Sequence, residues 1–362
     1  MIKHRVPAAL RVLHVDAARE WRGGERQLLL LSRGLRERGV EPLVAARPGS
    51  PLLHRLKSEG IATAALAMLS DLDLLAVRRL RRLIATWRPD LVHAHDSRGH
   101  SLALAALLGR RGRIPLIVTR RSAAKPRGPL RYGPRVARFI ASSAAVRDGL
   151  VLGGVNADRI TVAYPGVSAR PPELPRDWRA ECGWTPETVV AGIVGPLAAE
   201  GARRQLDDLA GALPHDVAAR LGIVVLGGHA HGRDSVAGVP TFRAGYVHDV
   251  PHALAGLDLL LHPGGPEGNG TSVIEAMALG VPSVAFEAGG LGEVIIDGVS
   301  GTLVPAGDLR AFAARMAALA TDAKARRALA AACPERARAF ESGVMVDTIL
   351  AAYRDVLERS AV

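Results

Sequence analysis

Short apolar runs alternate with longer amphipathic stretches along most of the chain. Runs of roughly four to eight apolar residues are typical of strands buried on both faces, whereas apolar residues about three or four positions apart are typical of helices. In the first half, this pattern predicts strands over residues 10–15, 42–46, 61–66, 89–96, 114–119, 139–143 and 160–167, and helices over residues 26–38, 52–59, 72–87 and 144–152.

The alternation resumes in the second half of the chain. A proline-rich segment over residues 170–175 separates the two halves and is a candidate domain boundary. The pattern then predicts strands over residues 189–195, 222–226, 241–247, 257–263, 281–286 and 302–305, helices over residues 205–213, 249–257, 271–279 and 344–359, and a long alanine-rich helix capped by Asp308.

Two successive runs of strands alternating with helices predict an α/β protein with two Rossmann-like parallel-sheet domains. A length of 362 residues agrees with two domains. Because open α/β sheets bind ligands at the carboxyl ends of their strands, we expect the two domains to face each other across a ligand-binding cleft.

The charge balance restricts the classes of partner. The net charge is +12, and only four of the 47 basic residues are lysines, which is the usage of a GC-rich genome. A positive chain favours nucleotide diphosphates, anionic lipid surfaces or nucleic acid. Nucleic-acid binding would require aromatic residues among the basic ones or a known reader motif, and neither occurs. The arginine clusters at residues 78–82, 110–113 and 120–121 are most simply solvated surfaces.

Other features bear on the compartment. Cys182 and Cys333 are far apart and lack metal-ligand spacing, which indicates reduced thiols. No apolar run is long enough to span a bilayer, and Arg11 and His14 interrupt the first apolar segment, so we expect neither a membrane helix nor a signal peptide. The expected location is the cytoplasm, with peripheral contact of the basic first domain at the inner face of the cell membrane.

Residues 267–282 combine a glycine-rich loop with a helix after a strand. Thr271 or Ser272 would cap this helix, Glu275 would complete a capping box, and Gly280 would end it. The backbone N–H groups at such a helix start form an anion site at the sheet edge. The alternative is a structural turn in which Glu275 caps the helix and Glu267 is solvated.

The same stretch resembles a family signature. Glu267 and Glu275 are followed by the pattern Ala-Met-Ala-x-Gly-x-Pro, which resembles family 4 of the retaining glycosyltransferases with the two-Rossmann GT-B architecture. Asp90-x-Val92-His93-x-His95, the Gly23-Gly24 segment, the Gly-Gly-x-x-Glu segment at 289–293 and the hinge-like segment at 160–168 extend the resemblance.

The resemblance implies that the two domains bind different substrates. Residues 1–168 would form an acceptor-binding domain, and residues 169–343 would form a nucleotide-sugar-binding domain. Residues 344–362 would form a helix that crosses back and packs on the first domain.

The resemblance also implies roles for individual residues. Glu267, near the anomeric carbon of the donor sugar, and His95, at the donor or acceptor, would be the catalytic residues. Glu275 would bind the ribose. The remaining donor-binding positions would be Gly23, Gly24, Gly195, Tyr246, Gly268, Asn269, Gly270, Thr271, Gly289 and Gly290.

No metal or cofactor is expected beyond the nucleotide-diphosphate sugar, which is a co-substrate. The resembled class is generally metal-independent. Backbone N–H groups and cations would then stabilise the diphosphate as it leaves. Zinc on His93 and His95 is an alternative, but the sequence suggests no third ligand nearby.

The chain departs from the family at the first strand of the second domain. The family pattern places an arginine and a lysine on the diphosphate, but Pro196 and Gly201 occupy these positions here. Charge-assisted hydrogen bonds of this kind contribute about 1.5–3 kcal/mol each. Arg203 and Arg204 could substitute for them, or they could be exposed helix residues.

The favoured function is therefore retaining transfer of a hexosyl-type sugar from a nucleotide-diphosphate donor to a glycan or lipid-linked acceptor, in cell-surface polysaccharide or lipopolysaccharide assembly. Pro196 and Gly201 support an alternative, a degenerate protein that binds sugars or nucleotides or acts as a scaffold. A sugar-nucleotide epimerase is a weaker alternative. A glycosidase fits less well, because both of its acids must flank the scissile bond.

Overall fold

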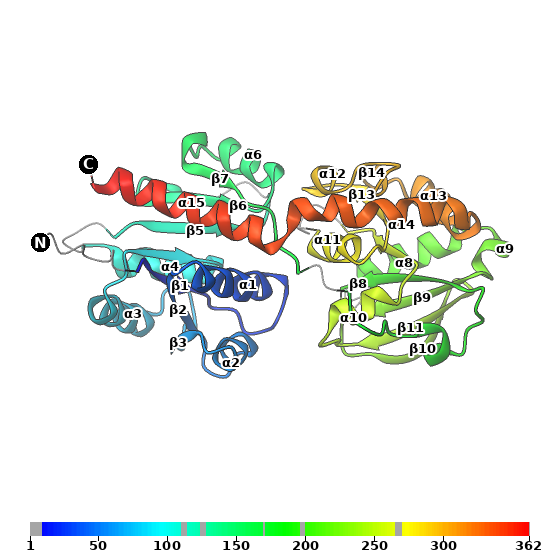
Figure 1. The fold of residues 1–362 in the computed structure, drawn as a ribbon, viewed down its shortest axis with the longest axis horizontal. Helices are drawn as coiled ribbons and strands as arrows, with labels where there is room; N and C mark the ends of the chain where they lie inside the picture. The colour runs from blue at the N-terminus through cyan, green and yellow to red at the C-terminus, as the bar shows by residue number, and fades with distance from the viewer. Residues whose placement is uncertain are drawn as a thin grey trace, which may run out of the picture. The chain divides into compact units, whose positions relative to one another are not determined.

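The computed structural model describes residues 9–109, 114–123, 128–168, 171–195, 200–264 and 270–361. The chain forms two compact units (Figure 1). Unit 1 consists of Met1–Gly166 and Ser342–Val362, and unit 2 consists of Val167–Glu341. Each unit contains a seven-stranded sheet with helices packed against it, which confirms the predicted pair of Rossmann-like domains.

The sheet of unit 1 has the strand order β3-β2-β1-β4-β5-β6-β7, and all its neighbours are parallel. Its strands are nearly continuous apolar runs because helices cover both faces. Their bounds are β1 Arg11–Val15, β2 Glu41–Ala46, β3 Ala62–Ala65, β4 Leu91–Ala94, β5 Leu116–Arg120, β6 Val136–Ala141 and β7 Ile160–Val162.

The helices of unit 1 begin where short polar side chains accept backbone N–H groups. Asp73, Asp96 and Ser143 cap α3, α4 and α6 in this way. The helices are α1 Gly23–Glu37, α2 Pro51–Ser58, α3 Leu74–Trp87, α4 Ser97–Leu107, α5 Pro129–Tyr132, α6 Ala144–Leu152 and α15 Ser342–Ala361, with a 3-10 helix at Ala157–Arg159.

Two features of these helices differ from the sequence prediction. Helix α1 begins at Gly23 rather than at residue 26, so the glycine pair lies in its first turn and not in a loop. Helix α4 was not predicted; it starts directly after the strand, at a cap formed by Asp96. Both corrections bring helix N-termini close to the carboxyl ends of β1 and β4.

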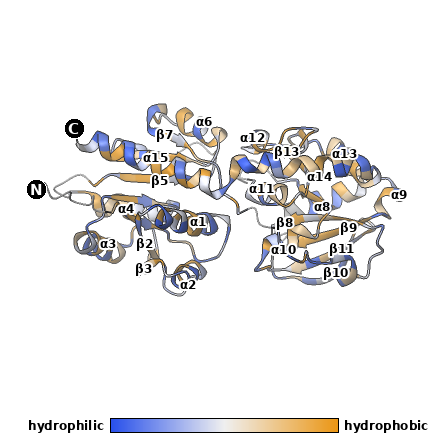
Figure 2. Ribbon diagram, in the orientation of Figure 1, coloured by the Kyte–Doolittle hydropathy of each residue, from blue (hydrophilic) through white to orange (hydrophobic). Residues whose placement is uncertain are grey.

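Alternate residues of β1 enter different cores. Figure 2 shows strand β5 of the same sheet mostly in the orange of hydrophobic residues. Leu13 and Val15 pack with α3 and α4 on one face of the sheet. Val12 packs with α1 and α15 on the other face, where Tyr353 of α15 is fully buried. The Tyr353 hydroxyl lies 2.6 Å from Nδ1 of His93, so α15 is tied to β4 by a polar contact as well as by apolar packing.

The sheet of unit 2 has the order β10-β11-β9-β8-β12-β13-β14. All its pairs are parallel except β10 with β11. The bounds are β8 Val189–Val194, β9 Leu221–Leu226, β10 His231–Val236, β11 Val239–Gly245, β12 Leu259–His262, β13 Ser283–Glu287 and β14 Gly301–Pro305. Strand β10 lies between two predicted strands and was not itself predicted, because an exposed edge strand needs no apolar run.

Helices of unit 2 follow its strands. The predicted cap is confirmed at Asp308, which accepts a hydrogen bond from the Ala311 N–H at 2.9 Å. The predicted alanine-rich helix is two helices, because Asp322 ends the first and caps the second. The bounds are α7 Trp178–Cys182, α8 Glu200–Gly211, α9 His215–Ala218, α10 Val250–Ala255, α11 Thr271–Ala278, α12 Leu291–Val294, α13 Leu309–Thr321 and α14 Ala323–Ala337, with a 3-10 helix at Arg338–Phe340.

In the part of the chain that the structure describes, no helix combines the length and the apolar character needed to cross a bilayer.

Replacing Tyr353 by phenylalanine keeps the ring in its core and removes the hydroxyl from His93. We expect the free energy of unfolding to fall by about 1–3 kcal/mol, because a buried ring nitrogen loses its partner. Urea denaturation measures the change. Tyr246→Phe is the matched control, since Tyr246 is exposed. An equal effect of both substitutions would contradict the structural role of the Tyr353 hydroxyl.

Candidate functional site

The candidate ligand-binding edge of unit 1 lies where β1 and β4 run side by side. Consecutive strands on either side of this pair lead away in opposite directions, which is the topological switch point of an open sheet. Asp16 directly follows β1, and His95 and Asp96 directly follow β4. The fold therefore brings three polar side chains to the position where such sheets bind ligands.

Three buried histidines lie behind this edge. His14 pairs with His93 in the β1–β4 register, and His95 lies two residues further along. His14 Nδ1 is 2.9 Å from His95 Nε2, and His93 Nε2 is 2.7 Å from Thr119 Oγ1. Burial lowers the pKa of His14 to about 3 and holds the pKa values of His93 and His95 well below the usual range. All three rings are therefore neutral at neutral pH.

The hydrogen bonds select one tautomer for His95. His14 Nε2 is buried and has no hydrogen-bond partner among the described residues. Burying an N–H group without an acceptor costs more free energy than burying an unprotonated ring nitrogen, so Nε2 of His14 carries no proton. His14 therefore has its proton on Nδ1 and donates it in a hydrogen bond to His95 Nε2. His95 must then carry its own proton on Nδ1. This makes His95 a hydrogen-bond donor toward any ligand that reaches that nitrogen.

The histidine cluster also bears on zinc. Each ring offers a nitrogen within 4.8 Å of the others, so His14 is the third candidate ligand that the sequence did not suggest. However, both nitrogens of His93 are hydrogen-bonded, and His14 and His95 are bonded to each other. A metal ion would have to replace these bonds, so the observed arrangement is that of a hydrogen-bonded network.

Asp16 is a buried carboxylic group that the sequence analysis missed. Its Oδ1 accepts a hydrogen bond from the Ala18 N–H at 2.9 Å, while Oδ2 is buried without a partner in the described chain. Burial raises the pKa of Asp16 to about 7, and the nearby charges of Asp96 and Glu25 add to the effect. The signal available in the sequence was its position directly after a strand.

The first turn of α1 completes this edge. Arg121 donates hydrogen bonds to the carbonyl oxygens of His95, at 2.9 Å, and of Gly24, at 3.1 Å. A side chain on Gly24 would meet this guanidinium, since an added Cβ would lie 2.7 Å from Nη1. Arg121 is therefore a structural and electrostatic part of the site, which corrects its assignment to a solvated surface cluster.

Unit 2 has an equivalent edge. Three neighbouring parallel strands, β8, β12 and β13, lead to Gly195, to Gly270 with Thr271, and to Gly289 with Gly290. Tyr246 follows β11 at the same edge and is exposed. The predicted residues Glu267, Gly268 and Asn269, and Pro196, lie outside the described residues.

The start of α11 differs in detail from the predicted capping box. Gly270 is the N-cap, with a left-handed φ of 61°, and among the described residues no side chain caps the helix. Thr271 and Ser272 are already its first residues, so Glu275 is too far along the helix to complete a capping box. Glu275 is instead buried in the second turn. The uncapped backbone N–H groups remain suited to an anion.

The two candidate replacement cations lie on α8, whose first turn includes Gly201. Arg203 and Arg204 are both exposed. Arg203 is 4.0 Å from Asp207. The pKa of Asp234 on β10 is lowered by the Ser235 N–H, by Arg243 and also by the charge of Arg203. Arg203 thus has acidic neighbours, and its side chain interacts with the β10 side of the unit.

His262 is a further polar group at this edge that the sequence analysis did not single out. It ends β12, and its buried Nε2 has no hydrogen-bond partner among the described residues. Burial lowers its pKa. Helix α8 is tied to the same segment, because Gln205 donates a hydrogen bond to the Pro263 carbonyl at 2.7 Å.

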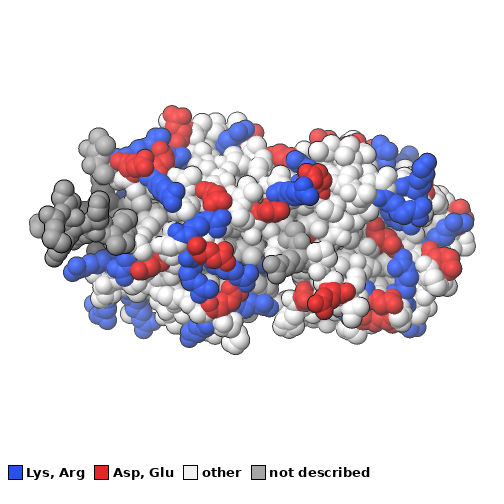
Figure 3. Space-filling model, viewed as in Figure 1, with Lys and Arg blue, Asp and Glu red and all other residues white. Residues whose placement is uncertain are grey.

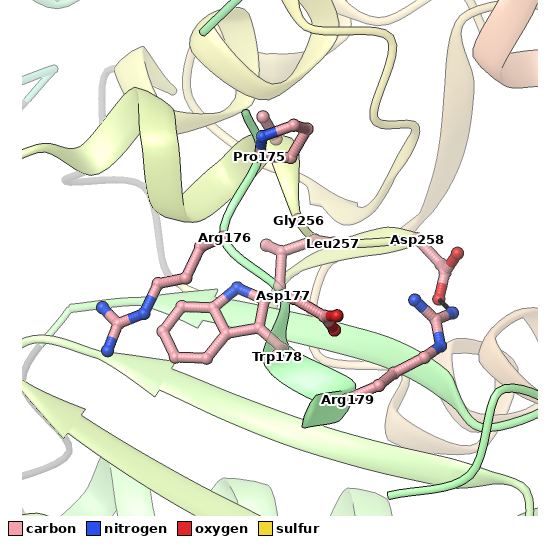
Figure 4. Close-up of a pocket in the computed structure, with 9 residues that line it drawn as sticks. Pro175, Arg176, Asp177, Trp178, Arg179, Gly256, Leu257 and Asp258 are labelled. Atoms are coloured by element: carbon pink, nitrogen blue, oxygen red, sulfur yellow. Dashed lines mark hydrogen bonds and ion pairs between the residues drawn. The ribbon is translucent and has the colours of Figure 1, made fainter. Parts of the chain in front are cut away.

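A pocket of about 400 Å³ lies elsewhere in unit 2, at the amino ends of β8 and β12 (Figure 4). Its charged groups are already satisfied within the protein. Arg176 stacks over Trp178 and pairs with Glu181, and Arg179 pairs with Asp258 at 2.5 Å. The lining is Pro175, Arg176, Asp177, Trp178, Arg179, Ala255, Gly256, Leu257 and Asp258. These internal pairs favour a structural role for the pocket.

Two family sequence models match the chain. Glycosyltransferase Family 4 matches residues 21–170, and Glycosyl transferases group 1 matches residues 188–322. The chain belongs to the family 4 glycosyltransferases. The first match includes His95, Asp96 and Arg121 but begins after Asp16, and the second includes the strand ends at Gly195, Gly270 and Gly289.

Known relatives agree with this membership. A 2-deoxystreptamine N-acetyl-D-glucosaminyltransferase of Streptomyces fradiae is 29% identical, over 86% of this chain and 86% of that protein. A D-inositol 3-phosphate glycosyltransferase of Stackebrandtia nassauensis is 33% identical, over 57% of this chain. The matched region spans about half of that relative, 51% of its length.

Solved structures share the GT-B fold. HepE of Anabaena, in complex with UDP and glucose, superposes with a TM-score of 0.80 at 19% identity, over 96% of this glycosyltransferase and 100% of that chain. Sucrose-phosphate synthase of Thermosynechococcus elongatus has a TM-score of 0.75 at 17% identity, over 97% of this glycosyltransferase and 100% of that chain. At these identities the likeness establishes the fold.

Asp16 gives a pH-dependent test of the site. Its raised pKa means that the native state holds this proton between about pH 4 and pH 7, whereas the unfolded chain releases it. Stability from Asp16 is therefore present at low pH and lost as the pH rises through 7. Relative to Asp16→Asn, we expect the wild type to lose up to about 4 kcal/mol of unfolding free energy between pH 4 and pH 8.

Urea denaturation at several pH values measures this difference. Asp148→Asn is the matched control, because Asp148 is an exposed partner of Arg147 on α6. Parallel pH profiles for the wild type and Asp16→Asn would contradict the raised pKa.

The tautomer of His95 can be measured by nitrogen NMR of protein whose histidines carry a nitrogen-15 label. We expect the proton on Nδ1 in the wild type, and a mixture of tautomers in His14→Leu, because the donor to Nε2 is gone. His14→Asn should retain the wild-type pattern, since its amide can donate from a similar position. A proton on Nε2 of His95 in the wild type would contradict the inferred network.

Proposed function

We propose that this glycosyltransferase moves a hexosyl sugar from a nucleotide-diphosphate donor to a hydroxyl group of a glycan or lipid-linked acceptor, with retention of the anomeric configuration. The observation that carries the proposal is the edge formed after β8, β12 and β13. It combines an uncapped helix N-terminus at Gly270 with a buried acid, Glu275, one turn further on. An anionic diphosphate and a ribose need these two kinds of group.

The donor would bind with its diphosphate at the start of α11. Gly270 allows this approach, because its left-handed backbone and its closeness to Leu291 leave no room for a side chain. Glu275 would accept hydrogen bonds from the ribose hydroxyls, and Glu267 would contact the sugar. HepE, which has a similar fold, is known in complexes with UDP and with UDP-glucose. This supports a nucleotide sugar as the donor.

Transfer would depend on stabilising the negative charge of the departing diphosphate. We assign this task to backbone N–H groups of α11 and of the segment at Gly289 and Gly290. A metal ion is not required in this proposal. His95 would donate its Nδ1 proton to a ligand oxygen, which fits a neutral ring held in one tautomer by His14.

For the acceptor, the proposal favours a glycan or lipid-linked hydroxyl compound of cell-surface polysaccharide or lipopolysaccharide assembly. A cyclitol acceptor is the second candidate, because the named activities of two relatives concern inositol 3-phosphate and 2-deoxystreptamine. Burial raises the pKa of Asp16 to about 7. Near neutral pH, this group could take a proton from the hydroxyl group of the acceptor substrate, or give one to it.

Pro196 and Gly201, at the positions of the family's arginine and lysine, support a second candidate function, in which the protein binds nucleotide sugars without efficient transfer. Measured turnover separates the two. Calorimetry with UDP, GDP and ADP should identify one diphosphate that binds, and its sugar derivatives should then be hydrolysed slowly and transferred to an acceptor. Binding without turnover of any donor would contradict the enzyme proposal and support the degenerate reading.

Glu275→Gln tests the ribose contact. We expect the dissociation constant of the nucleotide to rise about 10- to 100-fold, because a charge-assisted hydrogen bond is lost. Glu187→Gln is the control, since Glu187 is exposed in the same unit. Calorimetry measures both, and unchanged affinity in a folded Glu275→Gln variant would contradict the assignment.

A double charge reversal tests the replacement cations. If Arg203 and Arg204 hold the diphosphate, Arg203→Glu with Arg204→Glu should abolish nucleotide binding. Arg220→Glu, on an exposed side chain of the same unit, controls for net charge. Unchanged binding in the double variant would remove both arginines from the diphosphate site.

A further inference from the structure

Four exposed leucines are concentrated between β3 and the first turn of α3. Leu69, Leu72, Leu74 and Leu75 are 60%, 87%, 77% and 56% exposed, although the neighbouring Leu66 and Met68 are fully packed. Single exposed leucines are ordinary, but four within seven residues form a local apolar surface. We call residues 69–75 the leucine loop.

The leucine loop is held in shape by polar contacts from beneath. Asp73 accepts hydrogen bonds from the N–H groups of Leu69, at 3.0 Å, and of Ala76, at 2.9 Å. Arg47 donates to the Met68 carbonyl at 3.0 Å, and Arg98 lies 3.5 Å from Asp71. These contacts fix the backbone of the loop, so the leucine side chains stay exposed. The polar groups of the loop are already bonded within the protein.

Basic side chains continue the same surface along α3. Leu74 is in line with Arg78 and Arg82 at intervals of four residues, and Leu75 is in line with Arg79. In the part of the chain that the structure describes, these three arginines form no salt bridge, and all are exposed. Figure 3, drawn in the orientation of Figure 1, shows basic side chains gathered over α3. Arg81 differs, because it donates hydrogen bonds to carbonyl groups at the end of α4.

We propose that the leucine loop and the outer face of α3 dock on the surface of an anionic lipid bilayer. Leucines at the start of a helix would enter the interface between headgroups and acyl chains, and the arginines behind them would pair with lipid phosphates. A second copy of the chain fits less well. A two-fold contact through this surface would place the arginine rows of both copies close together, while the two acids of the loop already have partners: Asp71 pairs with Arg98, and Asp73 accepts backbone N–H groups.

The position of this surface connects it to the proposed reaction. The leucine loop follows β3, which is parallel to β2 and β1, so it lies at the same edge of the sheet as Asp16. Docking would bring that edge toward the membrane surface. This link to a lipid-linked acceptor rests on the proposed function, whereas the docking itself does not.

Vesicle flotation with the full chain tests the docking. The vesicles contain phosphatidylcholine alone or phosphatidylcholine mixed with phosphatidylglycerol, and the salt concentration is varied. We expect binding to the mixed vesicles only, falling steeply with salt. Leu72→Ser with Leu74→Ser and Leu75→Ser should weaken this binding at least about tenfold, and so should Arg78→Ser with Arg79→Ser and Arg82→Ser.

Leu152→Ser is the matched control, because Leu152 of α6 is 76% exposed in the same unit. It should float like the wild type. Thermal unfolding shows that each variant is folded, and nucleotide binding by calorimetry is expected to be unchanged in all of them. This readout separates the docking from the proposed function, because a chain that binds no nucleotide can still float.

Three results would overturn the docking proposal. The first is absence of binding to the anionic vesicles. The second is equal binding by the wild type and a folded triple-leucine variant. The third is a wild-type dimer in gel filtration that the triple-leucine variant converts to a monomer, which would assign the surface to self-association.

Discussion

His14 faces His93 across the pairing of β1 with β4, and this pairing fixes the position of the candidate groups in unit 1. Because side chains alternate along a strand, a slip of one residue would move the histidines to the opposite face of the sheet. In the observed register, His14 orients His95, His93 is bonded to α15, and Asp16 lies beside the cap of α4. The buried, partly unsatisfied carboxyl group of Asp16 costs stability above neutral pH, as is common for groups retained at functional sites.

The two units place different chemistry at equivalent edges. Unit 1 presents side chains, namely two acids, a neutral histidine and the Arg121 guanidinium, around the switch point of its sheet. Unit 2 presents mainly backbone, with glycines at the ends of three neighbouring strands and an uncapped helix start. Backbone amides suit a diphosphate whatever its base and sugar, whereas side chains provide the specificity that an acceptor needs. This contrast is the physical basis for proposing that donor and acceptor bind to different units.

The sequence predicts the fold well because buried parallel strands are apolar runs separated by capped helices. It also locates α11 and the glycines after β8 and β13, since these belong to local patterns. It misses His14 and Asp16, whose roles arise only when β1 lies beside β4, and Arg121, which becomes part of the site through contacts with distant backbone. The helix start at Gly270 and the edge strand β10 are also missed, because the sequence pattern does not distinguish them from their alternatives. Left-handed glycine competes with Thr271 as a cap, and an edge strand does not need apolar residues.

The most direct test of the central claim is the configuration of the sugar at the moment of transfer. Proton NMR can follow the protein as it turns over an α-linked nucleotide sugar with a hydroxyl acceptor. We expect the first product to carry an α-linkage, with the nucleoside diphosphate released in equal amount. A first product with a β-linkage would contradict retention. A bound donor that is never consumed, with any acceptor, would contradict the account of this chain as a working transferase.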